Sequence, residues 1–334
     1  MPVPAGGFDV GRRVLACLLV SGLLAITPAT ALETDQYEAW GHDLADGTDA
    51  LNAKINYELR KVLDRVNGRR GIRRLTCDTV TNHVTAHFRM LIFHPIEIWA
   101  SKSPLIERFP PTEEAELESR KTNILGNSSR WDIGTWLPYG PTIEINGVRI
   151  GTDKLAHFFS GGSSYYALHQ RATSQGKSAA EAERAVIDRG IFSEKTYLGY
   201  GTSGVLSAAD LEANYRGMTF FLGLCGGDSP QLERAGNGYE LARPFDARDY
   251  VTVDWDESYN NSGFIKRRWK KVKPRLLELC PMLDHPWVVA QWKRYRERDL
   301  ETPTEARMAQ LIAEGRMDDV SVYSLDATCS GRSP

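Results

Sequence analysis

Hydrophobic positions along the chain repeat mainly at helical spacing. Between residues 48 and 68 every third or fourth residue is apolar, as on one face of an amphipathic helix: Leu51, Ile55, Leu59, Val62 and Val66. Thr48 is a candidate N-cap, and Asn67-Gly68 is a typical helix end. A second helix is predicted from about Thr76 to Phe93, because Pro95 follows and disfavours helix in the preceding residue.

Three further helices are predicted in the middle of the chain and one near its end. Apolar spacing places them at about residues 152–172, 178–197, 207–225 and 302–314. Three of the four starts carry the pattern of a capping box, in which a hydroxyl residue is followed three positions later by an acid: Ser178 with Glu181, Ser207 with Asp210, and Thr302 with Glu305.

One short segment predicts strands instead. In the sequence TIEINGVRI, Asn146-Gly147 fits a two-residue hairpin turn. That turn sets Ile143 opposite Ile150 and Ile145 opposite Val148 on an apolar face, with Glu144 opposite Arg149 on the other face. Residues 101–140, which are rich in proline and acidic residues, are predicted to be loop.

These elements predict a mostly α fold with a small β-hairpin. A central three-helix module occupies residues 151–225. An N-terminal helical region, 32–150, ends in the hairpin, and a C-terminal helical region, 226–334, packs on the same domain.

The N-terminus predicts export. Arg12 and Arg13 precede the apolar run VLACLLVSGLLAI, and Ala29-Thr30-Ala31 resembles a small-residue cleavage site. Residues 1–31 are therefore predicted to be a cleaved signal peptide, and the protein to be periplasmic or extracellular, in contact with a cell envelope. No later run is long and apolar enough for a transmembrane span, so the mature chain is predicted to have none.

Net charge bears on the class of binding partner, and the cysteine content bears on disulfides. The chain has 41 basic and 43 acidic residues, a net charge of −2, which gives no indication of nucleic-acid binding. The mature chain keeps four cysteines with no CxxC spacing, which predicts two disulfides with three pairings open: Cys77, Cys225, Cys280 and Cys329.

Polar residues interrupt the apolar faces of the central module. Asp153 and His157 lie four residues apart, on one face of the first helix, beside Lys154. Asp210 and Asn214 lie four apart on the third helix, followed by Gly217. On the second helix Glu194 follows Gly190 by four and Val186 by eight residues, which points it inward. The three helices are thus predicted to enclose a polar pocket.

At these residues the chain resembles the VanZ-like family and related periplasmic lipoproteins. The shared pattern is Asp-Lys-x-x-His, a Glu on the next helix, then Ser-x-x-Asp-x-x-x-Asn-x-x-Gly. This chain has it at Asp153, Lys154, His157, Glu194, Ser207, Asp210, Asn214 and Gly217. A Gln after the Glu and an Arg before the Ser are missing. The resemblance covers about residues 151–225 and implies a helix arrangement and an envelope setting.

Two hypotheses follow. In the first, the protein is a hydrolase of an envelope lipid or glycan that works by acid–base or metal-assisted chemistry. His157 and Glu194 are then the acid–base candidates, and Asp153 and Asp210 orient them or bind a divalent metal. Lys154, Asn214 and Ser207 would contact the substrate.

The second hypothesis is a non-catalytic protein that binds the envelope or serves a structural role. Asp153 and the Ser207–Asp210 pair can act as helix caps, Lys154 can extend to solvent, and the cluster can be an internal ion-pair network.

Three other segments carry candidate chemistry. The spacing of His83, His87 and His94 is compatible with a metal site, but no Glu follows as in His-Glu-x-x-His, and core histidines are the favoured interpretation. The sequence VDWDES could add carboxylates to the pocket: Asp254, Asp256 and Glu257. Seven basic residues between Lys266 and Arg275 suit an anionic lipid or acidic polymer, or a solvated helix.

Overall fold

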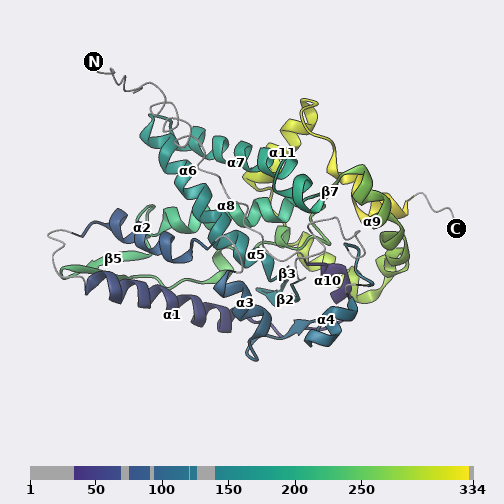
Figure 1. Cartoon of the computed structure of the whole chain (residues 1–334), viewed down its shortest axis with the longest axis horizontal. Helices are drawn as coiled ribbons and strands as arrows, with labels where there is room; N and C mark the ends of the chain where they lie inside the picture. Colours follow the sequence, from purple (N-terminus) through teal and green to yellow (C-terminus); the bar gives the residue numbers. More distant parts are fainter. Residues whose placement is uncertain (1–33, 69–74, 91–93, 120, 126–139, 331–334) are drawn as a thin grey trace, which may run out of the picture.

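The computed structural model describes residues 34–68, 75–90, 94–119, 121–125 and 140–330. The predicted signal peptide, residues 1–31, lies outside them. Helix accounts for 61% of the structure and strand for 8%, which confirms the mostly α prediction. Figure 1 shows α1, α2 and the β5–β6 pair at one end, α9 and α10 at the other, and α8 between them.

The N-terminal region is helical, with bounds that correct three predictions. Its helices are η1 (Gln36–Ala39), α1 (Thr48–Asn67), α2 (Cys77–Phe88), α3 (Pro95–Lys102) and α4 (Glu113–Ser119). Gly47, not Thr48, is the N-cap of α1, and the Thr48 hydroxyl donates to Asp46. α2 ends at Phe88, five residues before the predicted end. A separate helix, α3, follows, and His94 caps it by accepting a hydrogen bond from the backbone N–H of Ile96. The predicted loop 101–140 contains α4 and strand β1 (Arg108–Phe109).

The hairpin is confirmed in its register. β2 (Thr142–Ile145) and β3 (Val148–Gly151) pair with Ile143 opposite Ile150 and Glu144 opposite Arg149. Asn146 and Gly147 adopt φ values of 55° and 68°, the left-handed conformation that a primed turn requires. β1 pairs with β2, which makes a three-stranded antiparallel sheet.

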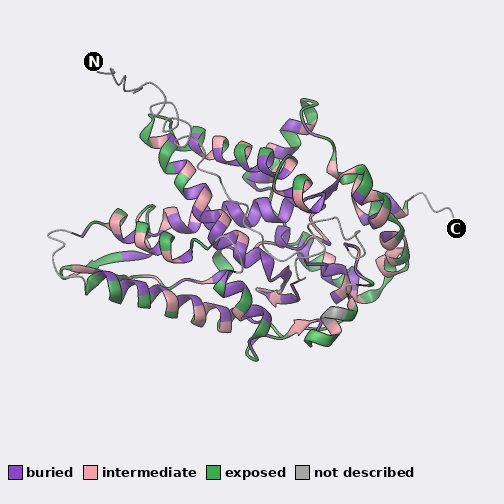
Figure 2. Cartoon of the chain, viewed as in Figure 1, coloured by how far each residue is buried: buried purple, intermediate pink, exposed green. Residues whose placement is uncertain are grey.

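The central module contains the predicted helices, the first of which is interrupted. α5 (Asp153–Ala156) continues through one π-helical turn, η3 (His157–Gly161), into α6 (Gly162–Ser174). α7 (Ala179–Lys195) has the predicted capping box, and a second π turn, η4 (Gly199–Ser203), leads to β4 (Val205–Leu206). α8 (Ala208–Gly223) is buried along nearly its whole length, and Figure 2 shows the buried residues concentrated around it.

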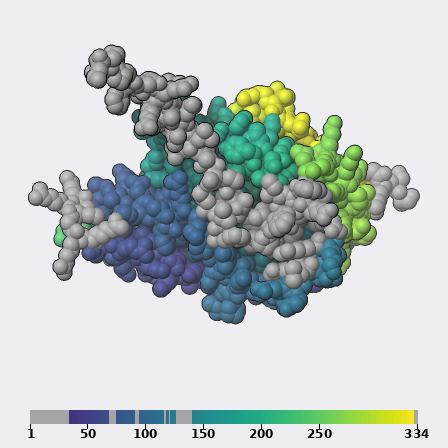
Figure 3. Space-filling view, viewed as in Figure 1, coloured from purple at the N-terminus to yellow at the C-terminus, as the bar shows by residue number. Residues whose placement is uncertain are grey.

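The C-terminal region packs on this module. Its elements are β5 (Leu232–Ala235), β6 (Gly238–Leu241), η5 (Ala247–Asp249), η6 (Val253–Trp255), β7 (Gly263–Phe264), α9 (Lys266–Leu279), η7 (Cys280–Asp284), α10 (Pro286–Arg296), α11 (Pro303–Ala313), η8 (Val320–Tyr323) and α12 (Leu325–Cys329). α11 has the predicted capping box and contacts α7 and α8. In Figure 3 the yellow C-terminal segments lie against the teal central helices, on the side away from the purple α1.

Disulfides tie distant segments together. Cys77 pairs with Cys225, which joins the start of α2 to the end of α8. Cys280 pairs with Cys329, which joins η7 to α12. Among the described helices, none combines the length and the hydropathy needed to cross a bilayer.

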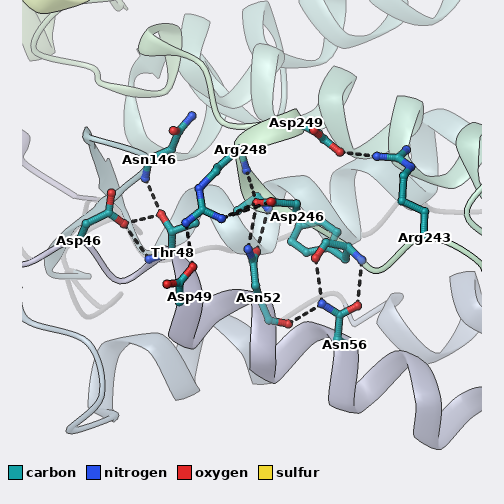
Figure 4. Close-up of polar contacts among 12 residues, drawn as sticks. Asp46, Thr48, Asp49, Asn52, Asn56, Asn146, Arg243, Asp246, Arg248 and Asp249 are labelled. Atoms are coloured by element: carbon teal, nitrogen blue, oxygen red, sulfur yellow. Dashed lines mark hydrogen bonds and ion pairs between the residues drawn. The ribbon is translucent and has the colours of Figure 1, made fainter.

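A polar network fixes the chain that enters the site region (Figure 4). Asn56 of α1 exchanges two hydrogen bonds of 2.8 Å with the backbone of Phe245. One turn earlier, Asn52 donates to Asp246 and accepts from the backbone N–H of Ala247. The segment that continues to η6 is therefore held on α1 by side chain–backbone bonds, which specify position as well as direction.

Stability should fall in acid partly because of His94. This imidazole is buried, stacks on Phe159 and donates its Nε2 proton to the carbonyl of Phe88. Burial lowers its pKa from 6.5 to about 4. Between pH 6.5 and 4 the unfolded chain binds a proton at His94 that the folded chain does not bind. The contribution of His94 to the free energy of unfolding is therefore complete above pH 6.5 and declines toward pH 4, by about 3 kcal/mol at most.

Urea unfolding at several pH values measures this slope. In His94→Asn the decline between pH 6.5 and 4 should be shallower, whereas His285→Asn, at an exposed histidine, should keep it. Equal slopes in wild type and His94→Asn would contradict the assignment.

Candidate functional site

Two helices cross at backbone contact and thereby set the geometry of the site. A Cβ at Gly217 of α8 would overlap the carbonyl oxygen of Phe158, and a Cβ at Gly162 would overlap the backbone of Gly217. Only glycine permits this approach. It brings the face of α8 that carries Asp210 and Asn214 against α5 and η3.

Lys154 is the centre of the resulting cluster. Its side chain is completely buried, and Nζ lies 2.6 Å from Asp153 Oδ2, 2.7 Å from Asp210 Oδ1 and 2.7 Å from Glu257 Oε1. Burial alone would lower the pKa of Lys154, but the three carboxylates outweigh it and raise this pKa well above 10.5. The alternative that Lys154 extends to solvent is wrong.

Glu257 comes from the segment after η6 and is held by Ser207. The Ser207 hydroxyl donates to Glu257 Oε1 at 2.5 Å and accepts from the backbone N–H of Asp210 at 3.0 Å, as the predicted N-cap of α8. Burial raises the pKa of Glu257 to about 7. The positive charge of Lys154 lowers this pKa, whereas the negative charges of Asp210 and Asp153 raise it further.

Asp210 does not complete the predicted capping box but turns to Lys154 and His157. One oxygen pairs with Lys154, and Oδ2 lies 3.2 Å from Nε2 of His157. Burial would raise the pKa of Asp210, but the charges of His157 and Lys154 lower it overall. The helix-capping hypothesis therefore accounts for Ser207 and not for Asp210.

His157 contacts both Asp210 and Asn214. Its side chain is 12% exposed, close to the 11% of Asp210 and Glu257, whereas that of Lys154 is 1% exposed. Nδ1 lies 3.2 Å from Asn214 Oδ1, while the Asn214 side chain also contacts the Tyr165 hydroxyl. If Asn214 Oδ1 accepts the Nδ1 proton, Nε2 is left facing the Asp210 carboxylate, an arrangement that suits an added proton or a metal ion.

The same residues can hold a cation. One ligand atom from each of Asp153, His157 and Asp210 lies within 4.8 Å of the others. The carboxylates of Asp153, Asp210 and Glu257 outnumber the single ammonium of Lys154 in a largely buried volume, and such an excess favours an added proton or cation.

Glu194 lies at the edge of this network. It is buried near the end of α7, where its carboxylate lies against the backbone of Gly199. Its charge helps to raise the pKa of Tyr165, after burial. Glu194 therefore lies near Tyr165, whose hydroxyl forms no hydrogen bond of good geometry.

The remaining candidates are distributed elsewhere. Asp256 accepts hydrogen bonds from Ser258 and Tyr295, and burial with acidic neighbours raises the pKa of Asp254 to about 8 at a separate place. His87 pairs with Glu58, while His94 caps α3. Thr34, which no sequence signal indicated, donates to Asp153 Oδ1 at 2.9 Å.

Replacing Lys154 should be strongly destabilising. Lys154→Met leaves three largely buried carboxylates without their cation, and such changes cost about 3–5 kcal/mol. Urea unfolding at pH 7 measures this loss, with the exposed Lys177→Met as control. Adding Glu257→Gln to Lys154→Met should recover part of it, since one buried negative charge is removed. A loss below about 1 kcal/mol, the value of an exposed pair, would contradict the central role of Lys154.

Comparison with known proteins is negative: no protein-family model, no curated protein and no solved structure matches the chain. The geometry of the cluster around Lys154 and His157 therefore carries the functional conclusion.

Proposed function

We propose that the protein is an exported hydrolase of the cell envelope, with its catalytic centre at His157, Asp210 and Asp153 and one divalent cation bound between them. The observation that carries this proposal is the convergence of those three ligand atoms within 4.8 Å.

The spacing supports metal binding. Two protein ligands at about 2.0–2.2 Å from a tetrahedral zinc ion lie roughly 3.3–3.5 Å apart. His157 Nε2 and Asp210 Oδ2 are 3.2 Å apart, close to that separation. Asn214 at Nδ1 would fix the tautomer and orientation of the ring, as outer partners of metal-bound histidines commonly do.

A cation here would activate water for hydrolysis. Held by His157, Asp153 and Asp210, a divalent ion would supply a Lewis acid that lowers the pKa of water and polarises a carbonyl or phosphoryl oxygen. Glu257, whose pKa burial raises to about 7, would accept the proton of the water and return it to the leaving oxygen. Lys154 holds the carboxylates of Asp153, Asp210 and Glu257 in position.

The substrate class comes from the setting. The resemblance to VanZ-like proteins over residues 151–225 and the predicted signal peptide favour an envelope lipid or glycan, and two disulfides suit an oxidising compartment. α9 would hold the protein to an anionic surface through Lys266, Lys270 and Lys273, which are exposed. Arg268 and Arg275 donate to backbone carbonyls instead.

A non-catalytic ion-pair network is the second candidate. The complete burial and threefold pairing of Lys154 favour it, because such a network can fix helix positions without reacting. The two candidates make different demands on His157. The proposed hydrolase requires it, whereas the ion pairs of Lys154 do not involve it.

His157→Ala should abolish both metal binding and activity while the fold persists. Elemental analysis of protein refolded with zinc or manganese should give about one ion per wild-type chain and none in the variant. Chromogenic carboxyl esters, phosphoesters and glycosides provide the activity assay, in which kcat/KM should fall about 100-fold or more.

His87→Ala is the matched control, since this histidine lies on α2 and pairs with Glu58. It should keep both metal and activity. A metal-free wild type with no activity on any of these substrates would leave the network as the function of the cluster.

A further inference from the structure

A second group of acids lies outside the site described above. One carboxylate oxygen from each of Asp254, Asp299 and Glu305 lies within 4.8 Å of the others. They come from η6, the connection after α10 and the first turn of α11. In the described part of the chain no basic side chain forms an ion pair with any of the three.

A cavity adjoins this group and contains buried polar atoms without partners. Its volume is about 190 Å³, and its lining includes Glu305, Glu212, Thr304 and Asn260. Glu212 is 1% exposed and Thr304 2% exposed. Glu212 Oε1 accepts from Arg216 at 2.6 Å, whereas Glu212 Oε2 and Thr304 Oγ1 lie near each other without a hydrogen bond of good geometry. Each such orphaned oxygen is costly unless a ligand satisfies it.

Two of the acids are held by contacts that use one carboxylate oxygen each. Tyr259 donates to Asp299 Oδ2 at 2.6 Å, and the backbone N–H of Thr302 donates to Glu305 Oε2 at 2.9 Å. Asp254 is held through its backbone carbonyl, which accepts from the Asn260 amide at 2.9 Å. The second oxygens of Asp299 and Glu305 remain available to a ligand.

We propose that Asp254, Asp299 and Glu305 bind one Ca²⁺ ion, with Glu212 and Thr304 facing it from the cavity. All available donors are carboxylate or hydroxyl oxygens, and hard cations of this class take six to eight oxygen ligands with flexible geometry. The absence of histidine and cysteine donors here disfavours zinc. Extracellular calcium would meet the exported protein at concentrations that suit a modest site.

The ion would stabilise the segments that carry the residues of the proposed catalytic site. Glu212 lies two residues from Asp210 on α8, and Asp254 lies three residues before Glu257. A cation that joins α11 to these two segments would hold Asp210 and Glu257 in the positions in which they meet Lys154. The site is therefore structural, and its occupancy does not depend on the proposed hydrolysis.

Calorimetric titration of EDTA-treated wild-type protein with CaCl₂ tests the proposal. We expect one ion per chain and a rise in Tm of about 5 °C at saturating Ca²⁺. Asp299→Asn, at an exposed position, should weaken Ca²⁺ binding at least tenfold without loss of folding, and Asp254→Asn should do the same. Asp284→Asn, an exposed acid of the same C-terminal region, is the matched control and should bind as wild type does.

Three results would overturn the proposal: no Ca²⁺ binding by wild type, unchanged binding in both acid variants, or loss of binding in His157→Ala, which would place the ion at the other cluster. Retained Ca²⁺ binding in a His157→Ala variant that has lost activity would support both sites separately.

Discussion

The pairing of the Lys154 ammonium is the constraint on which the rest of the structure depends. A fully buried cation must be matched by anions at short range, and here they come from three separate segments: α5, α8 and the chain after η6. Their relative positions are therefore fixed by one atom. Much of the surrounding architecture serves to deliver these groups: the hairpin leads into Asp153, glycines let α8 approach η3, and α1 holds the segment that leads to Glu257.

Negative charge is concentrated in two clusters of carboxylates, one around Lys154 and one around Asp254. Around Lys154 the carboxylates outnumber the ammonium, and around Asp254 they have no basic partner among the described residues. Excess charge of this kind destabilises a folded protein unless protons or cations neutralise it. In both clusters the excess of carboxylates favours an added positive charge. Only the first includes a group, His157, that suits reaction chemistry.

Local patterns predicted most of the helices, the hairpin register and the pairs on single helices. The capping boxes at Ser178 and Thr302 and the primed turn at Asn146 depend on neighbours within a few residues, so the sequence alone identifies them. Glu257 and Thr34 reach Asp153 and Lys154 across about a hundred positions, and no periodicity encodes such contacts. The π turn at His157 was equally invisible, since it changes the spacing on which helical patterns are read.

The cluster joins groups of two kinds, and their contacts differ in length. Around Lys154 three carboxylates pair with one ammonium at 2.6–2.7 Å, which fixes the segments that carry them. His157 makes two longer contacts of 3.2 Å, one with Asp210 and one with Asn214. The side chains of Asp210, Glu257 and His157 are 11%, 11% and 12% exposed, whereas that of Lys154 is 1% exposed. The ammonium therefore holds the carboxylates, and the proposed chemistry rests on the groups around it, because a preorganised charge is useful only where a substrate or an activated water can reach it.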